Sequence, residues 1–223
     1  MMLKMEKVGF KYEKANKNVL KNVTANFEQG KLYVIMGKSG AGKSTLLALL
    51  SGLDVCKSGV IAYQDKNLAE MNRNTYRAQN IGVVFQSYNL LTNATAIDNV
   101  VLPIDISGKN IKSKNTAYDI LGSMGINKQM ANRKVLKLSG GEQQRVAIAS
   151  AIAHNPDIII ADEPTGNLDG DTEIEIMNIL LRLAHEENKC VIIVTHSKDV
   201  AGYADELWGL AKGNLNYIKN RKT

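Results

Sequence analysis

Cysteines, prolines and aromatic residues are all scarce in this sequence. Two of its 223 residues are cysteine, three are proline and one is tryptophan. Cys56 and Cys190 lie far apart and form no C-x-x-C pair, which argues against a disulfide framework and against a zinc site. We therefore expect two ordinary thiols in a reducing compartment.

Long apolar runs are missing as well. No stretch approaches the roughly 20 continuous apolar residues of a membrane span. The segment Met1 to Lys7 lacks the apolar region of a signal peptide. We expect a cytoplasmic protein, in which any link to a membrane depends on another chain.

A strong charge of one sign is also absent. The net charge is +6, and the N-terminal lysines are scattered rather than gathered in a stripe. Such a pattern is typical of a solvated surface, so we expect no nucleic-acid partner. The closing basic residues, Lys219 to Lys222, are interpreted as a soluble tail. With 44% hydrophobic residues, the chain has enough apolar side chains for a core.

One stretch carries the clearest chemical signal. Residues 37–44 read Gly-Lys-Ser-Gly-Ala-Gly-Lys-Ser, after an apolar run and before a strong helix former. A strand, a glycine loop and a helix are the setting of a phosphate loop, in which backbone N–H groups and the helix N-terminus surround an anion. Lys43 is expected to reach the β- and γ-phosphates, and Ser44 to bind Mg²⁺. The sequence therefore predicts that the chain binds a nucleoside triphosphate. The expected nucleotide-binding residues here are Gly37, Lys38, Ser39, Gly40, Ala41, Gly42, Lys43, Ser44 and Thr45.

Three other apolar runs of strand length end in polar residues, namely Gln86, then Asp162 with Glu163, then His196. The carboxyl ends of parallel strands are where ligands bind in open α/β sheets. Asp162 suits a Mg²⁺ ligand, and Glu163 is placed to polarise an attacking water. Gln86 is placed to touch the metal and that water. A lone histidine is more often structural, but His196 is the third polar residue at such a strand end, which favours a functional role.

The remaining pattern predicts two kinds of layer. Residues 3–12 and 19–27 alternate apolar and polar side chains and predict an antiparallel sheet. Residues 66–79 predict a short polar helix. Between residues 95 and 135 the spacing is helical and no buried strand appears, which indicates a helical insert. Residues 206–218 predict a final hairpin.

A few single residues are open to more than one interpretation. Residues 172–187 predict an amphipathic helix with Ile174 among its inward residues. His154 and His185 follow no strand and are interpreted as surface residues of helices. Tyr12 comes 25 residues before the phosphate loop, where an aromatic ring could stack on adenine or equally fill a strand.

Residues 138–145 read Leu-Ser-Gly-Gly-Glu-Gln-Gln-Arg and run into a helix. Ser139 is a good N-cap, and Gly140 and Gly141 leave backbone N–H groups open at the helix start. The pattern fits an ordinary capped helix or a second anion site separate from the phosphate loop. Periodicity alone does not choose between them.

Together these motifs resemble, in the same order, those of ABC-transporter ATP-binding subunits. The resemblance implies that Tyr12 stacks on adenine, that Asp169 lies in the D-loop, and that His196 contacts the γ-phosphate. It implies that the signature residues of one subunit meet the γ-phosphate held by the other, so that a homodimer encloses two ATP molecules head to tail. The implied catalytic residues are Lys43, Gln86, Glu163 and His196. The implied Mg²⁺ ligands are Ser44, Gln86 and Asp162. The further implied nucleotide contacts are Tyr12, Ser139, Gly140, Gly141, Glu142 and Asp169.

The resemblance also implies an α/β fold. It consists of a RecA-like P-loop NTPase core with an N-terminal antiparallel β subdomain and a helical insert carrying the signature motif. Residues 1–223 are expected to form one ABC ATPase domain. Within it, residues 1–90 and 155–223 form the nucleotide-binding core with the β subdomain, and residues 91–154 form the helical subdomain.

Finer stretches, including residues 84–91, 95–103 and 162–169, are similar to the lipoprotein-releasing and macrolide or antimicrobial-peptide exporter group. This implies ATP hydrolysis that drives export or extraction of an amphipathic compound, peptide or lipoprotein. The partner would be a separate permease with four spans and a large external domain, which holds the chain at the inner face of the cell membrane.

Other functions remain open at this point. A regulatory ATPase of this branch would instead control cell-wall enzymes or a sensor kinase through a membrane partner. A soluble ABC ATPase of DNA repair or translation fits less well, because such proteins usually carry two cassettes or a long coiled-coil insertion. The chain also departs from its relatives, with Cys56-Lys57 where they usually have Pro-Thr, and Ser150 where they usually have arginine.

Overall fold

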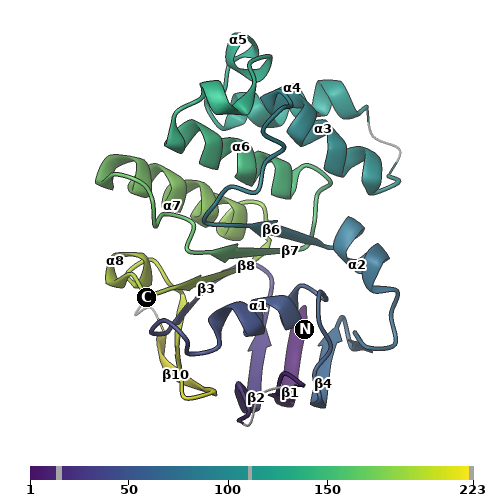
Figure 1. Cartoon of the computed structure of the whole chain (residues 1–223), viewed down its shortest axis with the longest axis vertical. Helices are drawn as coiled ribbons and strands as arrows, with labels where there is room; N and C mark the ends of the chain where they lie inside the picture. The colour runs from purple at the N-terminus through teal and green to yellow at the C-terminus, as the bar shows by residue number, and fades with distance from the viewer. Residues whose placement is uncertain (14–16, 110–111, 221–223) are drawn as a thin grey trace.

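The computed structural model describes residues 1–13, 17–109 and 112–220, which form two sheets and a layer of helices (Figure 1). Lys219 and Asn220 of the expected tail instead end the last strand, and Arg221 and Lys222 lie outside the described residues. None of the helices in the described ranges combines the length and apolar composition needed to cross a bilayer.

The smaller sheet is the predicted antiparallel one. Its strand order is β2-β1-β4-β5. The strands are β1 (Leu3–Phe10), β2 (Leu20–Phe27), β4 (Ser58–Tyr63) and β5 (Lys66–Asn67). Buried apolar and less buried polar side chains alternate over Leu3–Glu6 and Val23–Phe27, and register shifts near Val8 interrupt the predicted alternation.

The larger sheet has the strand order β10-β9-β3-β8-β7-β6. Its strands are β3 (Lys31–Met36), β6 (Ile81–Val84), β7 (Ile158–Asp162), β8 (Cys190–Thr195), β9 (Glu206–Ala211) and β10 (Asn214–Asn220). All neighbouring pairs are parallel except the hairpin β9–β10, which confirms the predicted final hairpin. Strands covered on both faces are continuously apolar, which explains the runs that the sequence shows.

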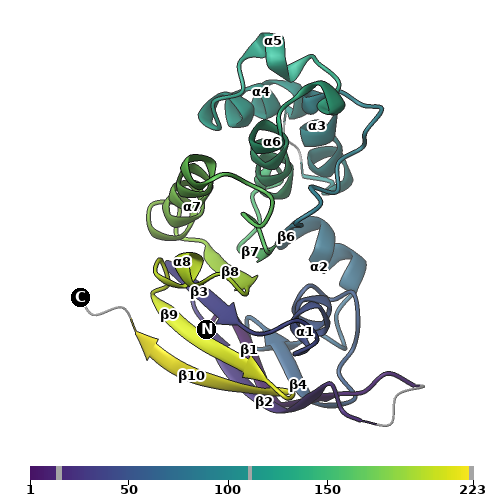
Figure 2. The same ribbon diagram turned by 60° about the vertical axis from the view of Figure 1, so that its left-hand side comes forward.

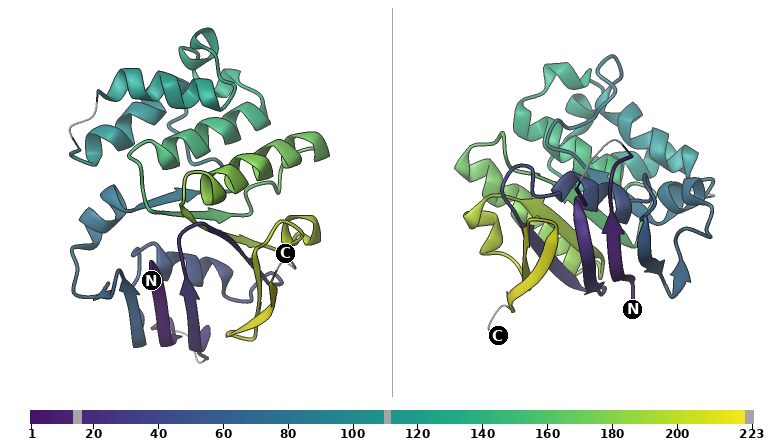
Figure 3. Two further views of the ribbon diagram at one scale, coloured as in Figure 1. Left: turned by 180° about the vertical axis from the view of Figure 1, so that it is seen from behind. Right: turned by 60° about the horizontal axis from the view of Figure 1, so that its bottom comes forward.

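Alternate residues of β3 enter two different cores. Tyr33 and Ile35 face α1 (Lys43–Leu50) and the antiparallel sheet, whereas Leu32 and Val34 face the helices on the other side. Figure 2 shows α1 below β7 and β8, and α6 and α7 above these strands. The β9–β10 hairpin joins the two sheets, because β10 lies beside β2 (Figure 3) and the N–H of Lys21 donates to the carbonyl of Gly213 at 2.7 Å.

Helices cover the other face of the larger sheet. They are α3 (Ala96–Ile106), α4 (Ser113–Ser123), α5 (Lys128–Ala131), α6 (Gly140–Ile152) and α7 (Gly170–His185), with a short 3-10 turn at Val135–Lys137 and the single turn α8 (Lys198–Ala201). The helices predicted between residues 95 and 135 are therefore confirmed. Ser150 donates its hydroxyl to the carbonyl of Asn99 at 2.9 Å and ties α6 to α3.

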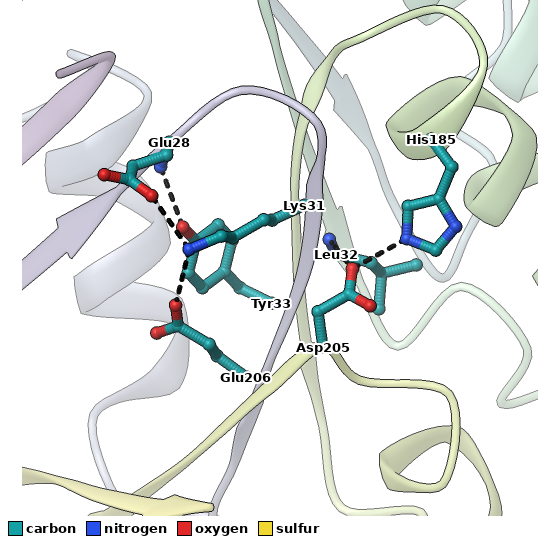
Figure 4. A network of polar contacts seen from close by, with 7 residues as sticks. All are labelled: Glu28, Lys31, Leu32, Tyr33, His185, Asp205 and Glu206. Carbon is teal, nitrogen blue, oxygen red and sulfur yellow. Dashed lines mark hydrogen bonds and ion pairs between the residues drawn. The ribbon is translucent and has the colours of Figure 1, made fainter. Parts of the chain in front are cut away.

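A polar network holds the amino end of β3 (Figure 4). Lys31 pairs with Glu28 at 2.8 Å and with Glu206 at 3.2 Å. The Asp205 carboxylate accepts the N–H of Leu32 at 2.7 Å and lies 2.7 Å from Nε2 of His185, which is exposed at the end of α7 as predicted. These contacts fix the strand that leads into the phosphate loop.

Two of the expectations for helices are wrong. Residues 66–79 are not one helix, because β5 occupies residues 66–67 and α2 (Arg73–Gln79) begins only after Asn72, whose side chain caps it. Ile174 is 50% exposed rather than inward. The buried stripe of α7 consists of Ile176, Met177, Leu180, Leu183 and Ala184. Ile174 lies about a third of a turn from the centre of that stripe.

His154 is also not a surface residue. Its side chain is 4% exposed, because the turn after α6 packs against the start of β6. Nε2 lies 3.2 Å from the carbonyl oxygen of Ile81 and must donate to it, while the buried Nδ1 has no partner in the described structure. Burial, opposed in part by that hydrogen bond, lowers the pKa of His154 to about 4.

We expect His154→Gln to flatten the dependence of stability on pH. Because the folded-state pKa lies below the ordinary value of 6.5, the unfolded chain binds the extra proton as the pH falls from about 6.5 to 4. The free energy of unfolding of the wild type should therefore fall by up to about 1.4 kcal/mol per pH unit more than that of the variant. Urea unfolding of both proteins between pH 7 and 4.5 measures this difference. The prediction would be wrong if the difference between their free energies of unfolding did not change with pH.

Candidate active site

The phosphate loop lies at the carboxyl end of β3. The chain leaves the strand after Met36, and Gly40 and Gly42 take positive φ values of 74° and 105° before α1 begins at Lys43. Gly42 is the N-cap residue and has no side chain to cap the helix, so the first N–H groups of α1 remain available to an anion. This is the geometry that the sequence motif predicts.

Lys43 extends back along this loop toward the acidic pair. Its Nζ donates to the carbonyl of Gly37 at 2.9 Å and lies 3.4 Å from Oε1 of Glu163. Lys38, Ser39, Gly40 and Ser44 are exposed, whereas Thr45 is buried. The loop thus presents its outer residues to solvent, with the lysine inside.

Four donors surround the Glu163 carboxylate. Oε2 accepts the Thr195 hydroxyl at 2.7 Å and the backbone N–H of His196 at 3.2 Å. Oε1 lies 2.7 Å from Nδ1 of His196 as well as near Lys43. Glu163 has a φ of 47°, a conformation that side chains other than glycine adopt rarely and that occurs often at functional sites.

The two neighbouring acids have opposite pKa shifts. Burial raises the pKa of Asp162, the charge of Glu163 raises it further, and Lys43 opposes both. Burial also pushes the pKa of Glu163 upward, but the hydrogen bonds from Thr195 and His196 outweigh it and leave that pKa below the ordinary value. Glu163 is therefore an ionised acceptor at neutral pH.

Gln86 and Tyr12 lie at the margins of this group. The Gln86 side chain is exposed and lies beside Gly166. A Cβ added to Gly166 would lie 2.9 Å from Nε2 of Gln86. The Tyr12 ring is 49% exposed, and its hydroxyl shares a hydrogen bond of 3.0 Å with Thr45 in the first turn of α1. An exposed ring next to the phosphate-loop helix is compatible with stacking on a base.

The signature residues form a second group. Ser139 and Glu142 close a capping box, in which the Glu142 carboxylate accepts the N–H of Ser139 at 2.7 Å. A Cβ on Gly141 would lie 2.6 Å from the side chain of Thr172, whose N–H donates to Asp169. Within the described ranges no hydrogen bond or ion pair joins residues 139–142 to the phosphate loop. The structure thus brings Lys43, Glu163 and His196 together and places the signature with Asp169 elsewhere.

The donor chemistry also suits Mg²⁺. Among the described residues, no group of three or more His, Cys, Asp and Glu side chains is arranged to hold a metal by itself. Mg²⁺ is usually held by one or two protein oxygens together with substrate phosphates. The Asp162 carboxylate and the exposed Ser44 hydroxyl are ligands of that kind.

Two residues near the site were not predicted from the sequence. Thr195 is 1% exposed and looks like the interior of a strand, yet it donates to Glu163. Gln144 is fully buried, and its Nε2 donates to the carbonyl of Pro164 at 2.7 Å, which ties the signature helix to the segment after Glu163. Position was the only sequence signal for a role at the site. Thr195 ends a strand, and Gln144 lies within the signature motif.

We expect Gly42→Ala to lower both stability and ATP affinity. An alanine Cβ would lie 3.2 Å from the carbonyl oxygen of Val19 at a φ of 105°, so the loop must shift. Gly40→Ala is the matched control, because its φ of 74° is also positive but nothing lies within 4 Å of the added atom. In urea unfolding, the control should lower the free energy of unfolding by about 1 kcal/mol, and Gly42→Ala should lower it by about 2–3 kcal/mol. Equal costs would show that the contact with Val19 is unimportant.

Comparison with known proteins agrees with this geometry. A profile of the ABC transporter family matches residues 20–166. The ABC transporter ATP-binding protein YclH of Bacillus subtilis, itself described as uncharacterized, is 42% identical over 98% of this chain and 97% of its own length. The lipoprotein-releasing system ATP-binding protein LolD of Rickettsia bellii is 40% identical over 96% of this chain and 97% of its own length.

Solved structures are similar over the whole chain. The dimeric structure of MJ0796, a bacterial ABC transporter cassette, has a TM-score of 0.90 and 36% identity, with full coverage of both chains. A post-hydrolysis state of the same cassette, bound to ADP and Pi, also has a TM-score of 0.90. These comparisons confirm the expected cassette fold. With its phosphate loop, acidic pair and histidine assembled, the chain belongs to the ABC transporter family as an ATP-binding subunit with ATPase activity.

Proposed function

We propose that this subunit drives export or extraction of an amphipathic compound, peptide or lipoprotein through a separate membrane permease. The observation that carries the proposal is the near-full-length similarity to lipoprotein-releasing ATP-binding proteins, together with a complete set of candidate catalytic residues. The chain would lie at the cytoplasmic face of the membrane, held there by the permease.

A groove between the strands and the helical layer supports a permease partner. It measures about 310 Å³, and its lining includes Leu53, Arg77, Phe85, Pro103 and His154. Its apolar walls and single guanidinium suit a short amphipathic segment of another protein better than a small polar ligand.

Exposed apolar side chains continue this surface. Leu91, Leu102 and Ile106 are 54%, 42% and 62% exposed, and the last two belong to α3, which contributes Pro103 to the groove. Exposed large apolar side chains on the elements that line a groove are typical of a protein interface. We assign this surface to the permease.

For the nucleotide, we propose a head-to-tail homodimer. Each chain presents two separated groups suited to anions, the phosphate loop and the open helix start at Ser139, Gly140 and Gly141. One nucleotide would lie between the phosphate loop of one subunit and the signature of the other. The similarity to a cassette solved as a dimer supports this arrangement.

Within each site, the residues have distinct roles. Lys43 binds the β- and γ-phosphates, Tyr12 stacks on adenine, and Gln86 and Asp169 complete the pocket near the γ-phosphate. Mg²⁺, held by Ser44, Asp162 and Gln86, would neutralise charge on the phosphates. Glu163 accepts a proton from the attacking water, and His196 holds the γ-phosphate. Loss of that phosphate then reopens the dimer.

We expect Glu163→Gln to keep ATP binding but to lower turnover on the order of 10²-fold or more, because the amide cannot accept the proton. Glu187→Gln is a matched control, since this acid lies two residues after α7 in a loose 3.8 Å pair with Arg182. Phosphate release and nucleotide binding, measured on both variants, test the assignment. Wild-type turnover in Glu163→Gln would remove Glu163 from the role of base.

The transport proposal is tested by tagging the protein, extracting it gently from native membranes, and identifying what co-purifies. We expect a four-span permease with a large external domain. Changing Leu102 and Ile106 to Asp should abolish its recovery, whereas Val60→Asp, which adds one charge to the antiparallel sheet at a site already 37% exposed, should not.

The other outcomes of this experiment distinguish the alternative functions. A permease recovered together with cell-wall hydrolases or a sensor kinase would favour a regulatory ATPase. Recovery only in the soluble fraction, with ribosomes or DNA, would contradict the transport proposal and leave the ATPase assignment in place.

A further inference from the structure

The two oxygens of the Glu163 carboxylate have different kinds of partner. Oε2 is bound by the Thr195 hydroxyl at 2.7 Å and by the backbone N–H of His196 at 3.2 Å. Oε1 is bound by Nδ1 of His196 at 2.7 Å and by Nζ of Lys43 at 3.4 Å. One oxygen is thus held by the end of a strand, and the other by two side chains.

The partners of Oε2 are fixed. Thr195 is the last residue of β8, is 1% exposed, and accepts the N–H of Gly37 at its carbonyl oxygen at 3.2 Å. Its hydroxyl oxygen also accepts the N–H of Ser197 at 3.0 Å. Because that N–H can only donate, the hydroxyl proton is directed at Glu163. A β-branched side chain in a buried strand has little freedom to turn away.

The partners of Oε1, in contrast, are two side chains that can turn away. The His196 side chain is 69% exposed, and the long Lys43 side chain, which is 12% exposed, extends from the first residue of α1. Both are the groups that the proposed function assigns to the phosphates. When they turn to the nucleotide, Oε1 loses both partners and Oε2 keeps both of its own.

We propose that Thr195 is a positioning residue for ATP hydrolysis, which anchors Oε2 of Glu163 so that Oε1 is the oxygen facing the attacking water. The inference rests on the proposed role of Glu163 as the base. In that step the water oxygen bonds to the γ-phosphorus, and one water proton passes to Oε1. The bond from the γ-phosphorus to the bridging oxygen breaks, with its electron pair left on ADP.

The hydroxyl matters because the backbone cannot hold the carboxylate alone. Without it, Oε2 would retain one hydrogen bond of 3.2 Å and the carboxylate could rotate about its terminal bond. A displacement of about 1 Å in a reacting group can cost up to about 10²-fold in rate. Binding of ATP does not use this contact, so affinity should be spared.

Thr195→Val removes the hydroxyl and keeps the shape, and Thr195→Ser keeps the hydroxyl. In steady-state hydrolysis by the full chain, we expect Thr195→Val to lower kcat by about 10-fold and to leave KM for ATP within about 2-fold of wild type. The kcat of Thr195→Ser should stay within about 3-fold of wild type. An unchanged kcat in Thr195→Val, or an equal loss in Thr195→Ser, would overturn the proposal. If the valine variant does not fold, Thr195→Ala provides the same comparison.

A double variant separates positioning from a general structural effect. If Thr195 acts through Glu163, adding Thr195→Val to Glu163→Gln should lower kcat no further, whereas a structural defect would multiply the two losses. The same set separates the two proposals. If kcat falls in Glu163→Gln but stays at the wild-type value in Thr195→Val, only the inference about Thr195 is wrong. If kcat stays at the wild-type value in Glu163→Gln, Glu163 is not the base.

Discussion

The parallel register of β3, β8 and β7 is the constraint on which the site depends. Met36 lies opposite Thr195, and Asp162 lies opposite Val194, so the segments that leave these strands start side by side. A shift of one residue would turn the two faces of a strand over and move the phosphate loop away from Glu163. Because both faces of the sheet are covered, such a shift would disturb two cores at once.

The charge of Glu163 then organises this edge of the sheet. A buried carboxylate without partners is costly, and here a lysine, a histidine, a threonine and a backbone N–H all face it. Lys43 and His196 are also the groups proposed to bind the phosphates. Nucleotide binding would thus exchange the carboxylate for phosphates around the same two side chains, which links occupancy of the site to the freedom of the base.

Each chain holds only half of a proposed nucleotide site. The phosphate loop begins α1 on one side of the larger sheet, whereas α6 lies in the helical layer on the other (Figure 2). Ser150 ties α6 to α3 within that layer, whereas Gln144 ties α6 to Pro164 in the segment after Glu163. In the proposed dimer, the signature of one copy would meet a nucleotide held by the phosphate loop of the other.

Local chemistry in the sequence determined the phosphate loop and the capped start of α6. Eight consecutive residues supply the glycines and Lys43, and a spacing of three pairs Ser139 with Glu142. The buried strands were equally clear, since each apolar run is visible by itself. Only the tertiary structure decided that His154 is buried, that Ile174 is exposed, and that Thr195 donates to Glu163. His154 meets Ile81 across 73 positions and Thr195 meets Glu163 across 32. Contacts of that kind follow from strand register and from the packing of helices on a sheet, and neither is contained in a local pattern.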